Sequence, residues 1–343
     1  MLNFLIFVAV TAVCNKFVLN IYFPMALSTW RRLPAVLPLR AKDSKKIKHC
    51  ITDMRSFHHF IMVSLRGIGQ VVFQDSALSG LLFLAGIFCN SLTMGVFALA
   101  GSMVGTLAAR LLRYDGKEIR DGLYGFNGTL AGIAVPCFLS VNVWSVMLMV
   151  VASVASTLVA HVFGKQKLLP GLTAPFVVIT WALLLVASVF PVLQPGVQAA
   201  GAGAVAFAPV RALSLGYSQI MLQGGSIFTG LLFFVAIAVN SVSMAWKSAL
   251  ACVLSLTVVL LPFIGVSSVN DGMWGYNAIL AFLAVTDIVP VSSFRRTKAF
   301  AALLLSFVFQ YAGMRLGLVT LTAPFVLSVW AVVLYDRYMN PNL

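Results

Sequence analysis

The chain has 343 residues, of which 61% are hydrophobic and only 9% are charged, and its mean hydropathy is +1.00. A soluble domain of this length cannot bury so much apolar surface, so the composition excludes that class and indicates a polytopic membrane protein. The net charge of +14 does not indicate nucleic-acid binding, because the basic residues gather between apolar segments, as membrane orientation requires.

The first 55 residues are predicted to form a peripheral, basic extension. The apolar run 2–13 is too short to span a bilayer. It has the length of a signal peptide, but it lacks a basic region before it, and the basic block that follows opposes export. We expect this block to lie in the cytoplasm; it contains Arg31, Arg32, Arg40, Lys42, Lys45, Lys46, Lys48 and Arg55.

The rest of the chain is a duplication. The stretch DGLYGFNGTLAG (121–132) returns as DGMWGYNAILAF (271–282), and LTAPFV (172–177) returns as LTAPFV (321–326). Two glutamines, Gln70 and Gln74, have counterparts in Gln219 and Gln223. The offset is 149 or 150 residues throughout (277 − 127 and 322 − 173). Two homologous halves follow, at 56–195 and 205–340.

Each half contains six apolar segments, at 57–74, 76–91, 94–112, 121–138, 144–163 and 170–190 in the first. If segment 57–74 dips into the membrane without crossing it, nearly all loop cations face the cytoplasm, and only Arg211 and Arg315 fall outside. The sequence thus predicts an all-α membrane protein of ten transmembrane helices, arranged as two inverted five-helix repeats. Each repeat has a re-entrant or broken element, and both termini are cytoplasmic.

Polar residues inside the apolar segments are neutral and come in repeat pairs. Asp121 and Asp271 stand before the duplicated glycine-rich elements, where we expect them to act as helix N-caps rather than as a buried proton relay. No nucleophile motif, metal-ligand spacing or phosphate-binding loop is present, so we expect no enzyme, no metal and no cofactor. The neutral pairs are Gln70 and Gln219, Gln74 and Gln223, Asn90 and Asn240, Asn127 and Asn277, and Thr173 and Thr322.

An uncharged pore with amides, hydroxyls and flat apolar walls suits a small neutral solute rich in hydrogen-bond donors. If the N–H donors of the solute stayed unpaired in an apolar slot, the cost would be on the order of several kcal/mol. The solute therefore needs oxygen acceptors along its path. The predicted walls are Phe73, Phe126 and Leu130 in one half and Leu222, Tyr276 and Leu280 in the other.

The paired Gly-aromatic-Asn-x-x-Leu and Leu-Thr-Ala-Pro-Phe elements resemble those of the urea transporter family, over about 56–338. The resemblance implies a homotrimer in the cell membrane, with one channel for passive urea flux in each protomer. It also implies slots at Phe126 and Leu130 and at Tyr276 and Leu280, with Phe73 and its repeat mate Leu222 as further slot residues. Amide oxygens would come from Gln70 and Gln219, and the central hydroxyls from Thr173 and Thr322.

Competing interpretations remain for these residues and for the function. The slot residues could be ordinary helix-packing residues, and Thr173 and Thr322 precede Ala-Pro as N-caps do. Asn127 and Asn277 are expected to hold the broken backbone rather than to contact solute. A channel for small amides or ammonia, or a membrane scaffold without a pore, are the alternative functions.

Overall fold

The computed structural model describes residues 41–166, 168–193 and 206–340, with side chains from residue 56 onward. No β-strand occurs within these ranges. Contacts divide the chain into residues 1–56 and 57–343; one helix crosses this boundary, and the side-chain contacts described below lie in the second unit. Most of the predicted extension, residues 1–40, lies outside the described part of the chain.

The apolar segments predicted in each half are helices, and the helices follow in the same order in the two halves. In the first half they are α2 (Ala41–Gln70), α3 (Ala77–Asn90), α4 (Leu92–Leu111), α5 (Gly116–Arg120), α6 (Gly125–Phe138), α7 (Val143–Lys165) and α8 (Ala174–Val189), followed by the 3₁₀ turn η1 (Pro191–Leu193). In the second they are α9 (Pro209–Ser218), η2 (Gln219–Met221), α10 (Ile227–Asn240), α11 (Val242–Ser255), η3 (Leu256–Leu260), α12 (Val266–Asn270), α13 (Gly275–Leu283), the π-helical η4 (Ala284–Ile288), α14 (Arg295–Arg315) and α15 (Ala323–Met339).

In the described part of the chain, four helical stretches are long and apolar enough to cross a membrane, by length and composition: Leu92–Leu111, Val143–Lys165, Val242–Leu260 and Arg295–Arg315. Five more apolar helices have 10 to 17 residues, which is less than the roughly 20 residues that a simple span needs. Such a mixture is typical of membrane proteins in which some helices start or stop inside the membrane.

The predicted N-cap role of Asp121 and Asp271 is wrong. Both are C-cap residues, of the short helices α5 and α12, and α6 and α13 begin four residues later. Gly122 and Gly272 follow with φ of +81° and +73°, a conformation that glycine adopts easily after a helix C-terminus. The true cap of α5 is Asp115, whose carboxylate accepts the backbone N–H groups of Glu118 and Lys117. These bonds hold the pKa of Asp115 below its usual range.

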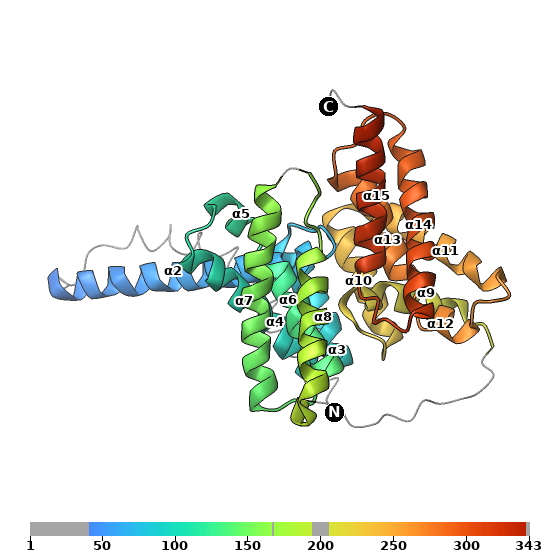
Figure 1. The fold of residues 1–343 in the computed structure, drawn as a ribbon. Helices are drawn as coiled ribbons and strands as arrows, with labels where there is room; N and C mark the ends of the chain where they lie inside the picture. Colours follow the sequence, from blue (N-terminus) through green and yellow to red (C-terminus); the bar gives the residue numbers. More distant parts are fainter. Residues whose placement is uncertain (1–40, 167, 194–205, 341–343) are drawn as a thin grey trace. The chain divides into compact units, whose positions relative to one another are not determined.

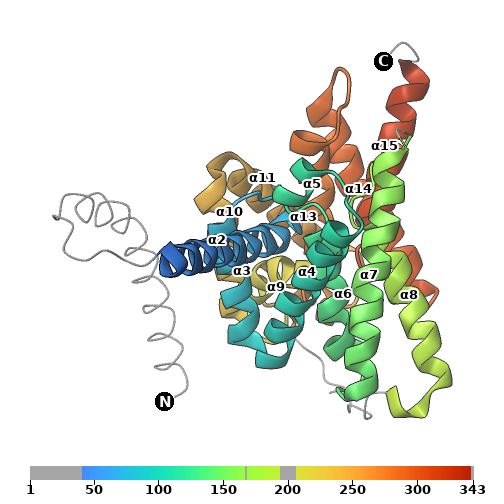
Figure 2. The same cartoon turned by 90° about the vertical axis from the view of Figure 1, so that its left-hand side faces the viewer.

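The two halves join along α3 and α10, which lie side by side in Figures 1 and 2. Phe83 and Phe233 meet edge to face there, with ring centroids 5.0 Å apart. Around this contact, two crossed amide pairs link the halves. Asn90 Nδ2 donates to Gln223 Oε1 at 2.7 Å, and Asn240 Nδ2 donates to Gln74 Oε1 at 3.0 Å. Because each polar residue is paired with a partner from the other half, the interface holds no unpaired amide at these four positions.

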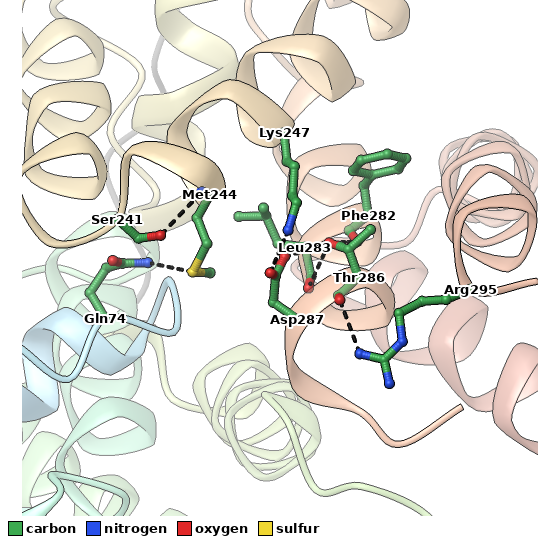
Figure 3. Close-up of polar contacts among 9 residues, drawn as sticks. All are labelled: Gln74, Ser241, Met244, Lys247, Phe282, Leu283, Thr286, Asp287 and Arg295. Carbon is green, nitrogen blue, oxygen red and sulfur yellow. Dashed lines mark hydrogen bonds and ion pairs between the residues drawn. The ribbon is translucent and has the colours of Figure 1, made fainter. Parts of the chain in front are cut away.

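The second half differs from the first at the end of α13. That helix continues into the π-helical turn η4, where Asp287 pairs with Lys247 of α11 at 2.5 Å (Figure 3). The Thr286 hydroxyl donates to the Asp287 carboxylate at 2.6 Å, and Arg295 donates to the Thr286 carbonyl at 3.1 Å. The first half has Phe97 and Cys137 at the positions of Lys247 and Asp287, 150 residues earlier (247 − 97 and 287 − 137). This ion pair therefore has no counterpart there.

Candidate functional site

The hydroxyls of Thr173 and Thr322 meet between the two halves, with 2.7 Å between their oxygen atoms. Each threonine is the N-cap residue of its helix, α8 or α15, and a proline follows in the first turn, as the sequence suggests. Neither hydroxyl makes a capping hydrogen bond, however. The two threonine side chains are thus directed at each other, and two helix N-termini converge on one buried point.

The capping bonds come instead from the duplicated asparagines. Asn127 Oδ1 accepts the N–H of Phe176, and Asn277 Oδ1 accepts the N–H of Phe325, at 3.1 Å in both halves. Phe176 and Phe325 are the third residues of α8 and α15, whose N–H groups lack partners within the helix. Each Asn therefore fixes the start of the neighbouring broken helix, while the hydroxyl of each Thr is left for the contact between the halves.

Gln70 and Gln219 hold the turns before the glycine-rich elements. Gln70 Nε2 donates to the Asp121 carbonyl at 2.8 Å, and Gln219 Nε2 donates to the Asp271 carbonyl at 3.1 Å. Asp271 also pairs with Arg211 through its side chain, at 3.1 Å between half-exposed groups. The amide nitrogen of each glutamine is used in this way, and its amide oxygen is left as an acceptor.

Four residues at the site adopt the left-handed backbone conformation that only glycine takes easily. They are Phe73 and Leu222, with φ of 60° and 58°, and Leu172 and Leu321, with φ of 46° and 48°. They form two repeat pairs, and in the described chain only two other non-glycine residues, Arg113 and Phe294, share this conformation. Strained backbone of this kind gathers at functional sites, where surrounding contacts hold it in place.

A cavity of about 290 Å³ lies beside the threonine pair, and all its lining residues except Ile288 belong to the first half. Four predicted site residues line it: Gln70, Phe73, Phe126 and Thr173. The other lining residues are Val71, Glu118, Leu123, Tyr124, Ala160, Gly164, Pro170, Gly171, Leu172 and Ile288. Thr173 therefore connects the cavity to Thr322 and the second half.

The remaining predicted wall and pore residues do not line this cavity. Leu130 and Leu280 are fully buried in the protein core. Gln219, Leu222, Tyr276 and Thr322 belong to the second half, where Tyr276 and Thr322 are each only 3% exposed. Phe73 reaches across to that half, because its ring packs edge-on against Phe325 at 6.2 Å.

Tyr276 is buried in the second half, where its counterpart Phe126 lines the cavity in the first. Its hydroxyl donates to the Leu321 carbonyl at 2.7 Å and lies 3.3 Å from Thr320 Oγ1. Phe126, at the same position in the first half, has no hydroxyl and is only partly buried. The carbonyl of Leu321 thus accepts a hydrogen bond from a tyrosine hydroxyl. Leu172, its counterpart, lines the cavity, and Phe126 offers no hydroxyl to its carbonyl.

One charged residue lies in the cavity lining, Glu118. Its carboxylate accepts a hydrogen bond from the Tyr124 hydroxyl at 2.6 Å, and that hydroxyl lies 3.1 Å from His161 Nδ1. The ring of His161 stacks on Tyr114 at 3.6 Å. The second half has a neutral version of this contact, in which Trp274 Nε1 donates to Ser268 Oγ at 3.0 Å. The sequence predicted an uncharged lining, and Glu118 is the exception.

Sequence reasoning missed Leu172, Leu321, Ala160 and Gln310. The left-handed leucines carry no sequence signal, because leucine rarely adopts that conformation. Ala160 and Gln310 could have been found by aligning the two halves, because they occupy equivalent positions in α7 and α14. The serines four residues before them confirm this alignment. Buried Ser156 and Ser306, also 150 residues apart (306 − 156), bond the carbonyl three residues before them in the same way.

Comparison with known proteins agrees with these features. The family model described as Urea transporter matches residues 61–337. The Urea transporter 1 proteins of Ovis aries and Capra hircus are each 27% identical to the chain, over 91% of it and 86% of their own length. That of Rattus norvegicus is 28% identical over 71% of the chain and 67% of its own length. The protein is therefore a membrane protein that belongs to the urea transporter family.

Proposed function

We propose that the protein conducts urea down its concentration gradient, through a narrow passage that runs along the first-half cavity and past the threonine pair. The observation that carries this proposal is the contact between Thr173 and Thr322, buried, 2.7 Å apart and contributed by two different halves. A hydroxyl pair at the joint of two broken helices offers oxygens to a solute where the membrane would otherwise offer none.

Urea matches the chemistry of this path. It is flat, neutral and carries four N–H donors around one carbonyl oxygen. Phe73 and Phe126 provide flat apolar walls in the cavity, while the Gln70 amide oxygen and the Thr173 hydroxyl provide acceptors. Passage past such groups replaces the hydrogen bonds that urea loses on leaving water, so the barrier is lowered for a donor-rich solute of this thickness.

The proposal includes the finer architecture. Ten transmembrane helices would form two inverted repeats, at 56–195 and 205–340, with re-entrant elements that bring Thr173 and Thr322 together. Support comes from the matching order of helices and the matching bonds of Asn127 and Asn277 in the two halves. The positions of the basic loops favour cytoplasmic termini, and family membership favours a homotrimer in the cell membrane.

The test compares single and double threonine substitutions in reconstituted vesicles. Thr173→Val or Thr322→Val removes one hydroxyl and leaves the other without its partner, which costs about 1–3 kcal/mol of stability. Thr173→Val with Thr322→Val removes both, so stability should recover, because no polar group is stranded. Urea permeability, measured by stopped-flow light scattering, should nevertheless fall by about tenfold in each single variant and further in the double variant.

Thr180→Val is the matched control. Thr180 lies on α8 about two turns beyond Thr173, is 1% exposed, and its hydroxyl has no hydrogen-bond partner within the described residues. Its substitution should leave flux unchanged. Equal urea flux in protein-containing and protein-free vesicles would refute the channel and favour a scaffold. Faster flux of acetamide, formamide or ammonia than of urea would reassign the solute.

A further inference from the structure

Among the residues that the structure describes, the amide nitrogen of Asn127 has no hydrogen-bond partner, although Asn127 is fully buried. Its orientation is fixed, because its oxygen accepts the N–H of Phe176 at 3.1 Å and the amide cannot turn without losing that bond. A buried N–H donor without an acceptor is costly, by an amount comparable to a lost hydrogen bond. Four other buried side-chain atoms of the described residues also lack a partner, among them Thr180 Oγ1 and Gln310 Nε2, so the position of Asn127 relative to the cavity has to distinguish it.

The second half shows where this nitrogen is directed. There the equivalent atom, Asn277 Nδ2, donates to Gln310 Oε1 at 3.0 Å and to the Leu321 carbonyl at 3.3 Å. The first-half counterparts of Gln310 and Leu321 are Ala160 and Leu172, and both line the cavity. The positions that supply both acceptors of Asn277 Nδ2 in the second half therefore lie at the cavity in the first, while Asn127 itself is packed behind the lining residues.

Differences at neighbouring positions open the same space. Gly171 stands where the second half has Thr320, and Phe126 where it has Tyr276. Thr320 and Tyr276 are buried, at 6% and 3% exposure, whereas Gly171 and Phe126 are partly exposed to the cavity. The segment between α7 and Thr173 is also one residue longer, since Lys165 and Arg315 are 150 apart while Thr173 and Thr322 are 149 apart.

We propose that Asn127 Nδ2 is the hydrogen-bond donor that binds the carbonyl oxygen of the solute, and that Ala160 keeps this donor free. This rests on the proposed function, and it adds a recognition element that the oxygens of the passage do not supply. Those oxygens bind the N–H groups of urea, but its carbonyl oxygen needs a donor. In the second half Gln310 takes the equivalent donor, so solute recognition through this amide is confined to the first half.

The first test places the second-half arrangement in the first half. Ala160→Gln supplies an acceptor for Asn127 Nδ2, as Gln310 does for Asn277, while Ala160→Met adds a side chain of similar size without that acceptor. Urea and thiourea permeabilities are measured for both variants, because thiourea has the same N–H donors but a much weaker acceptor in place of oxygen. We expect urea permeability about tenfold lower in Ala160→Gln than in Ala160→Met, with thiourea permeability equal in the two.

Equal urea permeability in the two Ala160 variants would overturn the inference. If both variants block both solutes, Asn127→Asp decides, because at nearly the same volume it keeps the acceptor for the Phe176 N–H and replaces the amide donor by a carboxyl oxygen; Asn277→Asp, equally buried, controls for the acidic group itself. The urea to thiourea ratio of Asn127→Asp should fall several-fold, whereas the matched Asn277→Asp should keep the wild-type ratio. A ratio that is unchanged in Asn127→Asp, or that falls equally in Asn277→Asp, would contradict the assignment.

The wild-type protein separates this inference from the proposed function. Urea flux in wild-type vesicles tests the channel itself, and its absence would remove both proposals. Urea flux in the wild type together with equal behaviour of Ala160→Gln and Ala160→Met would leave the channel standing and remove only the role of Asn127.

Discussion

The first-half cavity and its second-half counterpart are built on the same framework but filled differently. Both have an Asn that caps the next broken helix and a Gln that holds the preceding turn. In the first half Ala160 and Phe126 line a cavity, whereas their counterparts Gln310 and Tyr276 are buried in the second. The comparison teaches that positions shared by the halves preserve the geometry of the site, while the differing positions decide what it can admit.

The largest effect is expected where the halves are the same. A Cβ atom on Gly80 would lie 1.8 Å from the Leu65 carbonyl oxygen, and one on Gly230 would lie 1.9 Å from that of Ser214. Both carbonyl oxygens belong to helix backbone, so they cannot move aside as a side chain could. We expect Gly80→Ala and Gly230→Ala each to lose more than about 4 kcal/mol of stability, which would appear as loss of folded protein on size-exclusion chromatography.

Gly164→Ala is the control for that pair. A Cβ there would meet nothing within 4 Å, and alanine should stabilise the end of α7 by up to about 1 kcal/mol. Well-folded Gly80→Ala and Gly230→Ala proteins would contradict this expectation. They would show that the helices in contact at these glycines can move apart without loss of stability.

A smaller effect is expected from exchanging the aromatic residues at which the halves differ. Phe126→Tyr places a hydroxyl opposite the Leu172 carbonyl, as Tyr276 does for Leu321, and should lower urea permeability about fivefold by engaging that oxygen. Tyr276→Phe loses one buried hydrogen bond, and should cost about 1 kcal/mol of stability, because Asn277 still donates to the Leu321 carbonyl.

Stopped-flow permeability and thermal unfolding in detergent measure the two effects of this exchange. A Phe126→Tyr protein that conducts urea as well as the wild type would show that the Leu172 carbonyl takes no part in passage.

The smallest effect is expected from the ion pair that the second half has and the first half lacks. The side chains of Lys247 and Asp287 are 33% and 23% exposed, so solvent screening limits the contribution of the pair to about 0–1 kcal/mol. Lys247→Met and Asp287→Asn should therefore shift the unfolding temperature only slightly and leave urea flux unchanged. A loss of flux would link the π-helical turn, whose Ile288 lines the cavity, to the passage.

Sequence alone predicted the helical segments well, for physical reasons. Serine at 76 and 91 begins α3 and α4 with its hydroxyl on a backbone N–H, so the boundaries at these residues were readable. The identical Leu-Thr-Ala-Pro-Phe stretches indicated two helix starts, and the structure begins α8 and α15 there. Periodicity and capping are local properties, and local properties can be read from the chain.

The cavity could not be predicted in the same way. Asp121 followed by Gly122 resembles a helix start, yet the same dipeptide also suits a helix end with a left-handed glycine, and the structure takes the second alternative. The free amide of Asn127 depends on Ala160, 33 residues away (160 − 127), and its meaning appears only beside Asn277 and Gln310. Such features are set by tertiary contacts between different helices.

The meeting of α8 and α15 at the threonine pair has an electrical consequence. Each helix N-terminus carries a partial positive charge of about half an elementary charge, and here two of them face one buried point. A proton or sodium ion entering between them would be repelled from both sides. A membrane containing this protein could therefore remain permeable to urea at all times without losing its voltage, and no moving gate would be needed to protect it.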